Sequence, residues 1–187
     1  FDTIFIHDIS EINDKKKFNK IYFSLLKLKK KNITKNIGCS IYETKDLKKI
    51  SKYKFDVIQA PVNIFNKEIF EKKYIDYFKK RGTNLEIRSI FLQGLLLAQP
   101  DTLPKKFKKW KNLFLELHNF HQKEKISKIS IAFSILKKKK YKSVVVGVSS
   151  LGDFKEILRN SSKKIKNLPN FNVQSKRYLT NPKMWKI

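Results

Sequence analysis

The sequence contains one cysteine, one methionine, five glycines and five prolines. The lone Cys39 cannot form an internal disulfide and has no CxxC partner for zinc, so we expect a cytoplasmic protein without a bound metal. The longest apolar stretches, such as residues 90–98, are far shorter than the roughly 20 residues of a membrane span, so we expect no membrane partner. Because the only methionine is Met184, we also expect the complete protein to have residues before Phe1.

Acidic residues are few, and arginine is rare among the basic ones. The 43 basic and 16 acidic residues give a net charge of +27, which is typical of a basic nucleic-acid or polyanion-binding module. Only four of the basic residues are arginines, although specific phosphate and base recognition favours the bidentate guanidinium. Lys, Asn and Ile, which have A/T-rich codons, are abundant, so nucleotide composition explains the charge more simply. We expect no specific nucleic-acid partner, and the polyanion-binding module stays as an alternative.

Apolar residues form five short runs that are separated by helical patterns. The runs are rich in Val, Ile and Phe and are continuously apolar more than alternating, as in strands buried on both faces of a parallel sheet. They cover residues 3–6, 37–41, 55–60, 85–90 and 144–147. Such strands alternating with helices predict an α/β fold, with a parallel sheet either closed into a barrel or left open and doubly wound.

The segments between the runs have the apolar spacing of amphipathic helices. Thr44 is expected to cap one helix, Gly82 to end another, and Ser150 with Asp153 to form a capping box. The apolar stripes lie in residues 18–28, 47–50, 69–78, 107–117, 129–136 and 154–158. Residues 1–160 are expected to form the main body, and residues 161–187 a tail that packs on it through Trp185.

Polar or small residues follow the apolar runs. In parallel-sheet folds the carboxyl ends of the strands converge on a crevice, so these residues are the candidates for function. They are His7 and Asp8, Cys39 and Ser40, Gln59 to Pro61 with Asn63, Arg88 and Ser89, and Gly147 to Ser150.

The first three strand ends each allow a functional and a structural interpretation. His7 is placed to donate a hydrogen bond or transfer a proton to a substrate carbonyl, or it is a structural histidine beside Asp8. Gln59 and Asn63 offer amide groups that match a carboxamide edge, whereas capping of a loop is the commoner role of such amides. Cys39 has no obvious base partner and is expected to be a buried, inert thiol.

Two further groups are considered as ligand sites. Gly147 to Ser150 join a strand to a capped helix and present backbone N–H groups, a positive helix end and two hydroxyls, which suit a phosphate. Serine also caps helices without any ligand. His118 and His121 lie three residues apart, but no carboxylate or cysteine set lies nearby in the sequence, so we expect no metal there.

Five motifs in register resemble the aldo/keto reductase family over residues 1 to about 160. They are FDTIFIH at 1–7, IGCS at 37–40, VIQAPVN at 57–63, RS at 88–89 followed by LQGLL at 92–96, and VGVSS at 146–150. The resemblance implies a TIM (β/α)8 barrel, of which this chain carries about the fourth to eighth β-α units plus a C-terminal extension. It also implies hydride transfer between a nicotinamide cofactor, NADP or NAD, and an aldehyde or ketone. The polar strand ends lead us to expect a sugar as one substrate.

The resemblance also implies roles for individual residues. His7 is the fourth member of a catalytic tetrad that positions the carbonyl, and Asn63 contacts the substrate. The remaining residues bind the cofactor: Ser40 and Gln59 hold its carboxamide, Arg88 and Ser89 lie in the loop after the seventh strand, and Gly147, Ser149 and Ser150 line the adenosine-phosphate end. From its proximity to these residues, Lys155 is expected to reach a 2′-phosphate.

Three features depart from the family pattern. The tyrosine, aspartate and lysine of the tetrad belong to the first three β-α units, which the chain lacks, so the chain alone is expected to be inactive. Arg88 stands where an aromatic residue often stacks on nicotinamide; a guanidinium can stack as well, or it can recognise an acidic substrate. Ile157 stands where an asparagine often lies near the adenine. A barrel relative without catalysis is therefore a further alternative.

Overall fold

The computed structural model describes residues 1–137, 139–163, 165, 167–171, 173 and 176–185. The chain forms two compact units, each of which is built from separate segments. Unit 1 comprises Phe1–Pro61, Glu68–Arg88 and Lys140–Val145, and unit 2 comprises Val62–Lys67, Ser89–Lys139 and Val146–Ile187. The predicted boundary near residue 160 stays a prediction, and residues 164, 166, 172, 174–175 and 186–187 of the predicted tail lie outside the described residues.

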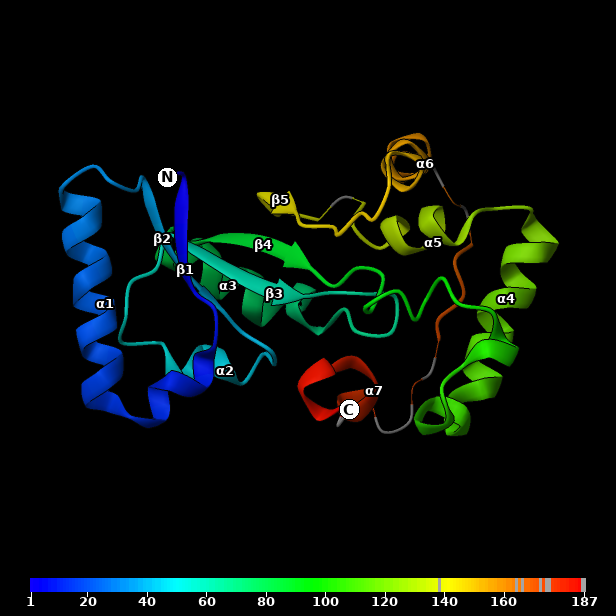
Figure 1. Ribbon diagram of the computed structural model, residues 1–187, viewed down its shortest axis with the longest axis horizontal. Helices are drawn as coiled ribbons and strands as arrows, with labels where there is room; N and C mark the ends of the chain where they lie inside the picture. Colours follow the sequence, from blue (N-terminus) through cyan, green and yellow to red (C-terminus); the bar gives the residue numbers. More distant parts are fainter. Residues whose placement is uncertain (138, 164, 166, 172, 174–175, 186–187) are drawn as a thin grey trace. The chain divides into compact units, whose positions relative to one another are not determined.

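Unit 1 is built on a five-stranded sheet in which every neighbouring pair is parallel (Figure 1). The strands lie side by side in chain order, whereas a doubly wound sheet reverses its order at a switch point. They are β1 (Thr3–Ile6), β2 (Asn36–Ser40), β3 (Val57–Pro61), β4 (Asn84–Arg88) and β5 (Ser143–Val144). The parallel α/β fold predicted from the continuous apolar runs is confirmed, and this order is that of strands along the wall of a barrel.

The fourth and fifth strands are shorter than their apolar runs. β4 ends at Arg88 because Ser89 has a left-handed φ of 59°, which takes the chain out of extended geometry. β5 contains only Ser143 and Val144, whereas the expected strand continued to Gly147. The length of a strand is limited by how far its neighbour pairs with it, and a run of apolar residues does not reveal this by itself.

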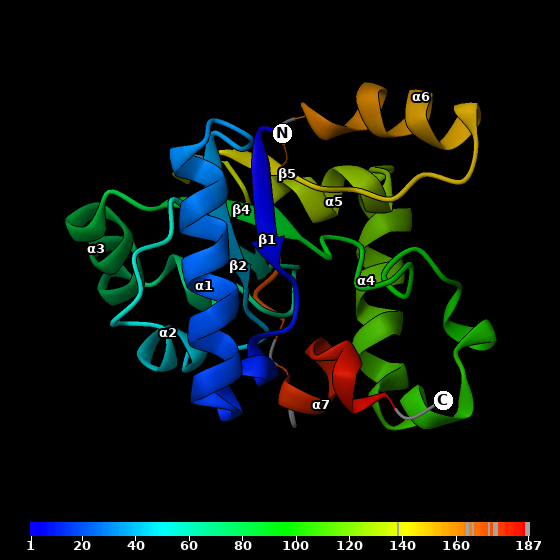
Figure 2. The same cartoon turned by 60° about the vertical axis from the view of Figure 1, so that its left-hand side comes forward.

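The helices of unit 1 flank this sheet, and α1 residues contact β2 (Figure 2). Asp14 caps α1 by accepting a hydrogen bond from the Lys17 amide at 2.9 Å, and the helix buries Phe18, Tyr22 and Leu25 along one stripe. The helical segments are η1 (Ile9–Asn13), α1 (Lys15–Lys30), α2 (Asp46–Lys49), η2 (Glu68–Phe70) and α3 (Lys72–Arg81).

One predicted cap in unit 1 is confirmed and one is wrong. α3 ends at Gly82, whose φ of 61° suits a residue without a side chain. Thr44 does not cap α2, because its hydroxyl donates a 2.5 Å hydrogen bond to Glu68 Oε1, and Lys45 holds the cap position. This hydrogen bond to a carboxylate distant in sequence fixes the orientation of the Thr44 hydroxyl, and a local capping pattern does not reveal it.

Asp56 ties α1 to the sheet just before β3. Its carboxylate accepts two hydrogen bonds from Lys29 Nζ, at 2.6 and 2.7 Å, and a third from the Ile37 amide at 2.9 Å. Because the carboxylate satisfies both a helix cation and a strand amide, the position of α1 is coupled to the start of β2.

Unit 2 is mainly helical. The stripe predicted over residues 107–117 begins as the 3-10 helix η4 and continues as α4, and Ser150 caps α6 by accepting from the Asp153 amide at 3.0 Å, as expected. The Trp110 ring stacks on Tyr178 with centroids 5.6 Å apart, and the tail residue Trp185 meets Phe107 at 4.8 Å. The elements are η3 (Pro100–Thr102), η4 (Lys105–Trp110), α4 (Lys111–Glu124), α5 (Lys128–Ser134), α6 (Leu151–Ser161), α7 (Lys176–Thr180) and η5 (Pro182–Met184). No helix among the described residues has the length and apolar content of a membrane span.

Gly38 in β2 gives a stability test of the sheet. A Cβ added there would overlap the Phe5 ring and lie 3.0 Å from the Val57 carbonyl oxygen. Gly38→Ala should therefore lower the free energy of unfolding by about 1–3 kcal/mol through overpacking, measured by denaturant titration. Gly147→Ala is the matched control, because a Cβ there meets nothing within 4 Å. Equal stability of the two variants would contradict close packing at Gly38.

Candidate functional site

The carboxyl edge of the unit 1 sheet brings four predicted site residues together. Ile6 pairs with Cys39, so His7 and Ser40 each follow that pair by one residue on neighbouring strands. Ser40 pairs with Gln59, and Arg88 ends β4 two residues after the partner of Gln59. The strand ends therefore converge in this unit, as the parallel arrangement predicts.

A row of polar side chains crosses four strands just inside this edge. Ser40, Gln59, Glu86 and Ser143 are consecutive register partners on β2, β3, β4 and β5, so they lie on one face of the sheet. Ser40 Oγ donates to Gln59 Oε1 at 3.3 Å, and Gln59 Nε2 donates to Glu86 Oε1 at 2.6 Å. Ser143 Oγ donates to Glu86 Oε2 at 2.7 Å. We call these four residues the polar row.

Arg88 lies over one end of the polar row. Its Nε donates to Ser40 Oγ at 3.2 Å, its Nη2 donates to the Ile41 carbonyl at 3.0 Å, and its guanidinium lies 4.5 Å from the centroid of the Tyr42 ring. Burial lowers the pKa of Arg88 from its ordinary value, which the Tyr42 oxygen partly opposes. A guanidinium nevertheless keeps its charge at neutral pH, so the edge of the sheet carries a fixed planar cation.

His7 is exposed immediately after β1, where it is open to solvent and to a ligand. The carboxylate of the adjacent Asp8 caps η1 by accepting from the Ser10 amide at 2.8 Å. Both interpretations of His7, a hydrogen-bond donor to a substrate carbonyl and a structural histidine beside Asp8, stay predictions.

Asn63 and Ser89 belong to unit 2. The Asn63 side chain is 0% exposed, and its Oδ1 accepts from the Phe65 amide at 3.0 Å, which is the loop-capping alternative. Among the described residues Asn63 Nδ2 has no hydrogen-bond partner. Ser89 adopts a left-handed conformation, and the same loop holds Leu92, with φ 50°, and Gln93, with φ 57°. The predicted contact of Asn63 with the substrate and the predicted contact of Ser89 with the cofactor both stay predictions.

The start of α6 carries the predicted phosphate-binding residues of unit 2. Gly147, Ser149 and Ser150 are exposed, as is Lys155 in the following turn. Asp153, however, accepts a hydrogen bond from the Ser149 amide at 3.0 Å through Oδ2. A carboxylate therefore engages one of the donors that a phosphate would use, and adds a like charge beside it.

Glu86, Ser143 and Tyr42 are the parts of the site that sequence reasoning missed. Glu86 carried a usable signal, since a carboxylate stands between the apolar residues Leu85 and Ile87 of a predicted strand. Ser143 and Tyr42 carried no such signal. The contact of Ser143 with Glu86 depends on strand register, and the contact of Tyr42 with Arg88 depends on the direction of the Arg88 side chain.

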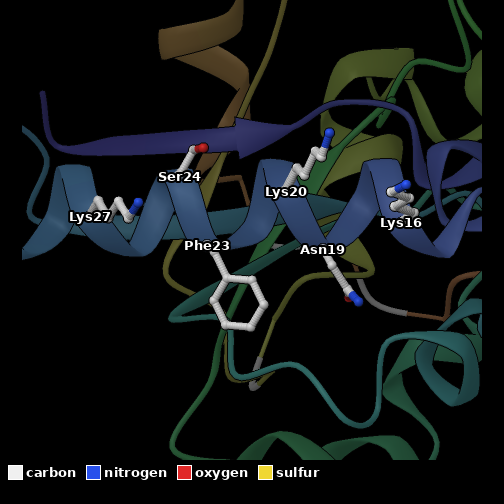
Figure 3. A pocket seen from close by; sticks show the side chains of 6 residues that line it. All are labelled: Lys16, Asn19, Lys20, Phe23, Ser24 and Lys27. Atoms are coloured by element: carbon white, nitrogen blue, oxygen red, sulfur yellow. The ribbon is translucent and has the colours of Figure 1, made fainter.

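The other candidate sites have little support. His118 and His121 approach each other with ring centroids 5.8 Å apart, but across the described ranges no group of three His, Cys, Asp or Glu residues is arranged to hold a metal. A groove of about 520 Å³ runs along the outer side of α1 (Figure 3). It is lined by Lys16, Asn19, Lys20, Phe23, Ser24 and Lys27. A single helix supplies this lining, and none of the predicted site residues belongs to it.

Comparison with family models matches residues 1–168 to the model described as Aldo/keto reductase family. Similar solved structures include the aldo-keto reductase AKR11C1 from Bacillus halodurans in its holo form, with a TM-score of 0.65 and 16% identity over 97% of this chain and 61% of that chain. The aldo/keto reductase from Brucella melitensis gives a TM-score of 0.58 and 18% identity over 89% of this chain and 56% of that chain.

The glycerol dehydrogenase AKR11B4 from Gluconobacter oxydans gives a TM-score of 0.55 and 20% identity, over 89% of this chain and 61% of that chain. These identities support similarity of fold. The chain spans 56–61% of the length of these three structures. None of the curated proteins compared with the chain matches it.

Cys39 supplies a chemical test of the site's packing. Burial raises the pKa of its thiol to about 12, with smaller contributions from Asp46 and Asp8, so the folded thiol stays protonated from pH 7 to 9. Alkylation of Cys39 at pH 8, followed by mass spectrometry of its peptide, should be at least about a hundredfold slower in the folded protein than in denaturant. Rapid labelling of the folded protein would show an accessible thiolate instead.

Proposed function

Because this chain belongs to the aldo/keto reductase family, we propose that the protein transfers a hydride between a nicotinamide cofactor and the carbonyl of an aldehyde or ketone. The observation that carries this proposal is the junction of Ser40, Gln59 and Arg88 at the carboxyl edge of a parallel sheet. Parallel α/β folds bind their ligands at this edge. A polar carbonyl such as a sugar is the substrate class that the polar strand ends favour.

The donor and acceptor groups at this edge fit a nicotinamide carboxamide. Gln59 donates one N–H to Glu86 and accepts one hydrogen bond from Ser40. The second N–H and the second lone pair of its amide are left for a ligand. A carboxamide needs one donor and one acceptor, and Gln59 keeps both, so Gln59 would hold the carboxamide directly. Ser40, which is 0% exposed and donates to Gln59, would support the Gln59 side chain. The planar Arg88 group is suited to stack on a neutral ring. The cofactor, when bound, supplies the hydride.

His7 is proposed to donate a hydrogen bond to the substrate carbonyl. An imidazole N–H at this oxygen stabilises the negative charge that develops there as hydride arrives at the carbon. We assign no residue of this chain to the tyrosine, aspartate and lysine roles of the tetrad, and we expect residues 1–187 alone to lack turnover.

The adenosine-phosphate end of the cofactor is proposed to contact Gly147, Ser149 and Ser150, with Lys155 as a cation for a 2′-phosphate. Asp153 disfavours a bound 2′-phosphate, because its negatively charged carboxylate already accepts a hydrogen bond from the Ser149 amide. This carboxylate favours NAD over NADP, although NADP is the form that the family resemblance suggests.

The first test measures cofactor binding by the protein expressed from its complete gene. Gln59→Met should weaken nicotinamide dinucleotide binding about tenfold in calorimetric titration, because a thioether cannot replace the amide hydrogen bonds. Gln122→Met, on the exposed surface of α4, is the matched control and should bind as the unsubstituted protein does. Turnover is then followed by nicotinamide absorbance with a panel of aldehydes and aldoses.

Other outcomes of this test identify the alternatives. Cofactor binding without turnover of any carbonyl would indicate a barrel relative that has lost catalysis. Binding of neither dinucleotide, together with salt-dependent binding of a polyanion, would replace the reductase proposal with the basic binding module. The lysines around the exposed Phe23 on α1 are the surface that such a polyanion would use.

Asp153 gives a separate test of cofactor choice. Asp153→Asn keeps an oxygen for the Ser149 amide but removes the charge, so affinity for NADPH should rise relative to NADH by roughly two- to fivefold. Fluorescence titration with both cofactors measures this ratio. Asp101→Asn removes an exposed carboxylate elsewhere in unit 2 and should leave the ratio unchanged. An unchanged ratio in Asp153→Asn would place the 2′-phosphate away from α6.

A further inference from the structure

The direction of every hydrogen bond in the polar row is fixed from its two ends. Arg88 can only donate, so Ser40 Oγ accepts from Arg88 Nε and has its own hydrogen left for Gln59 Oε1. A Glu86 carboxylate can only accept, so it takes the Gln59 NH₂ group at 2.6 Å and the Ser143 hydroxyl at 2.7 Å. The chain of donors therefore runs from Arg88 through Ser40 and Gln59 to Glu86.

Glu86 thus determines which way the Gln59 amide points. A reversed amide would place Oε1 against a carboxylate oxygen and would lose the 2.6 Å bond, which is charge-assisted and among the shortest in the unit. It would also turn the NH₂ group toward Ser40, whose oxygen already accepts from Arg88. Glu86 and Arg88 therefore favour the same orientation from opposite sides.

We propose that Glu86 is a positioning residue that holds the Gln59 amide in one orientation, so that its remaining N–H and lone pair meet a carboxamide ligand in a fixed order. Glu86 acts through Gln59 and needs no contact with the ligand. This inference rests on the proposed function, since the nicotinamide ring carries the carboxamide that Gln59 would hold.

The alternative for Glu86 is a purely structural role in joining β3, β4 and β5. The two roles differ in what they do to the two halves of the cofactor. Loss of sheet structure would weaken binding of every part of the dinucleotide. Loss of amide orientation would weaken only the interactions of the nicotinamide half.

The experiment compares the dinucleotide with its nicotinamide-free counterpart, ADP-ribose or 2′-phospho-ADP-ribose, on the protein expressed from its complete gene. Glu86→Gln has nearly the same size but can donate as well as accept, so it no longer selects one Gln59 orientation. Its affinity for the dinucleotide should fall about tenfold, while its affinity for the nicotinamide-free ligand changes less than about twofold. Glu71→Gln, at an exposed ion pair before α3, is the matched control.

Each outcome decides between the interpretations. Equal losses for both ligands, or no loss for either, would overturn the positioning role of Glu86 while leaving the reductase proposal intact. If the unsubstituted protein binds no dinucleotide, the proposed function fails and this inference fails with it.

A measurement on the unsubstituted protein covers the case in which Glu86→Gln does not fold. In ¹⁵N-glutamine-labelled protein the side-chain amide signal of Gln59 is identified by its loss in Gln59→Met. Addition of the dinucleotide should shift this signal, and addition of the nicotinamide-free ligand should not. An unshifted Gln59 signal at saturating dinucleotide would overturn the inference.

Discussion

Parallel pairing in one register is the constraint on which the site in unit 1 depends. Each strand is extended, so successive side chains alternate between the two faces and register partners share a face. A shift of β3 by one residue would send Gln59 to the opposite face from Ser40 and Glu86. The register that buries Ile58 and Ile87 is therefore also the register that links Gln59 to both of its polar neighbours.

The polar row shows how a charged residue is accommodated within an apolar sheet. Glu86 lies between Leu85 and Ile87, and its partial removal from water is offset by one short hydrogen bond to each carboxylate oxygen. The partial removal of the Arg88 charge from water is offset in a similar way, by hydrogen bonds to Ser40 and the Ile41 carbonyl and by the Tyr42 ring. The two opposite charges lie at the ends of one hydrogen-bonded chain, so each polarises the groups between them in the same sense.

Local sequence signals predicted the features whose causes are local. Gly82 ends α3 because a left-handed residue is needed there, and Ser150 caps α6 through a bond to a residue three positions away. Thr44 does not cap α2, and its hydroxyl is instead oriented by a hydrogen bond to Glu68, a residue 24 positions later. The apolar stripe of α6 also differs from its local prediction, because Ile157 is buried whereas Phe154 and Leu158 of the same pattern are exposed.

The sequence by itself determined that apolar strands alternate with helices in a parallel α/β arrangement, and that polar groups follow the strands. These properties depend on side-chain polarity and on periods of a few residues, which can be read along the chain. Only the tertiary structure decided that Glu86 accepts from Gln59 and that the Arg88 guanidinium packs on the Tyr42 ring. Hydrogen bonds and stacking depend on the positions of atoms within a few ångströms, and strand register and loop conformation fix those positions only when the chain has folded.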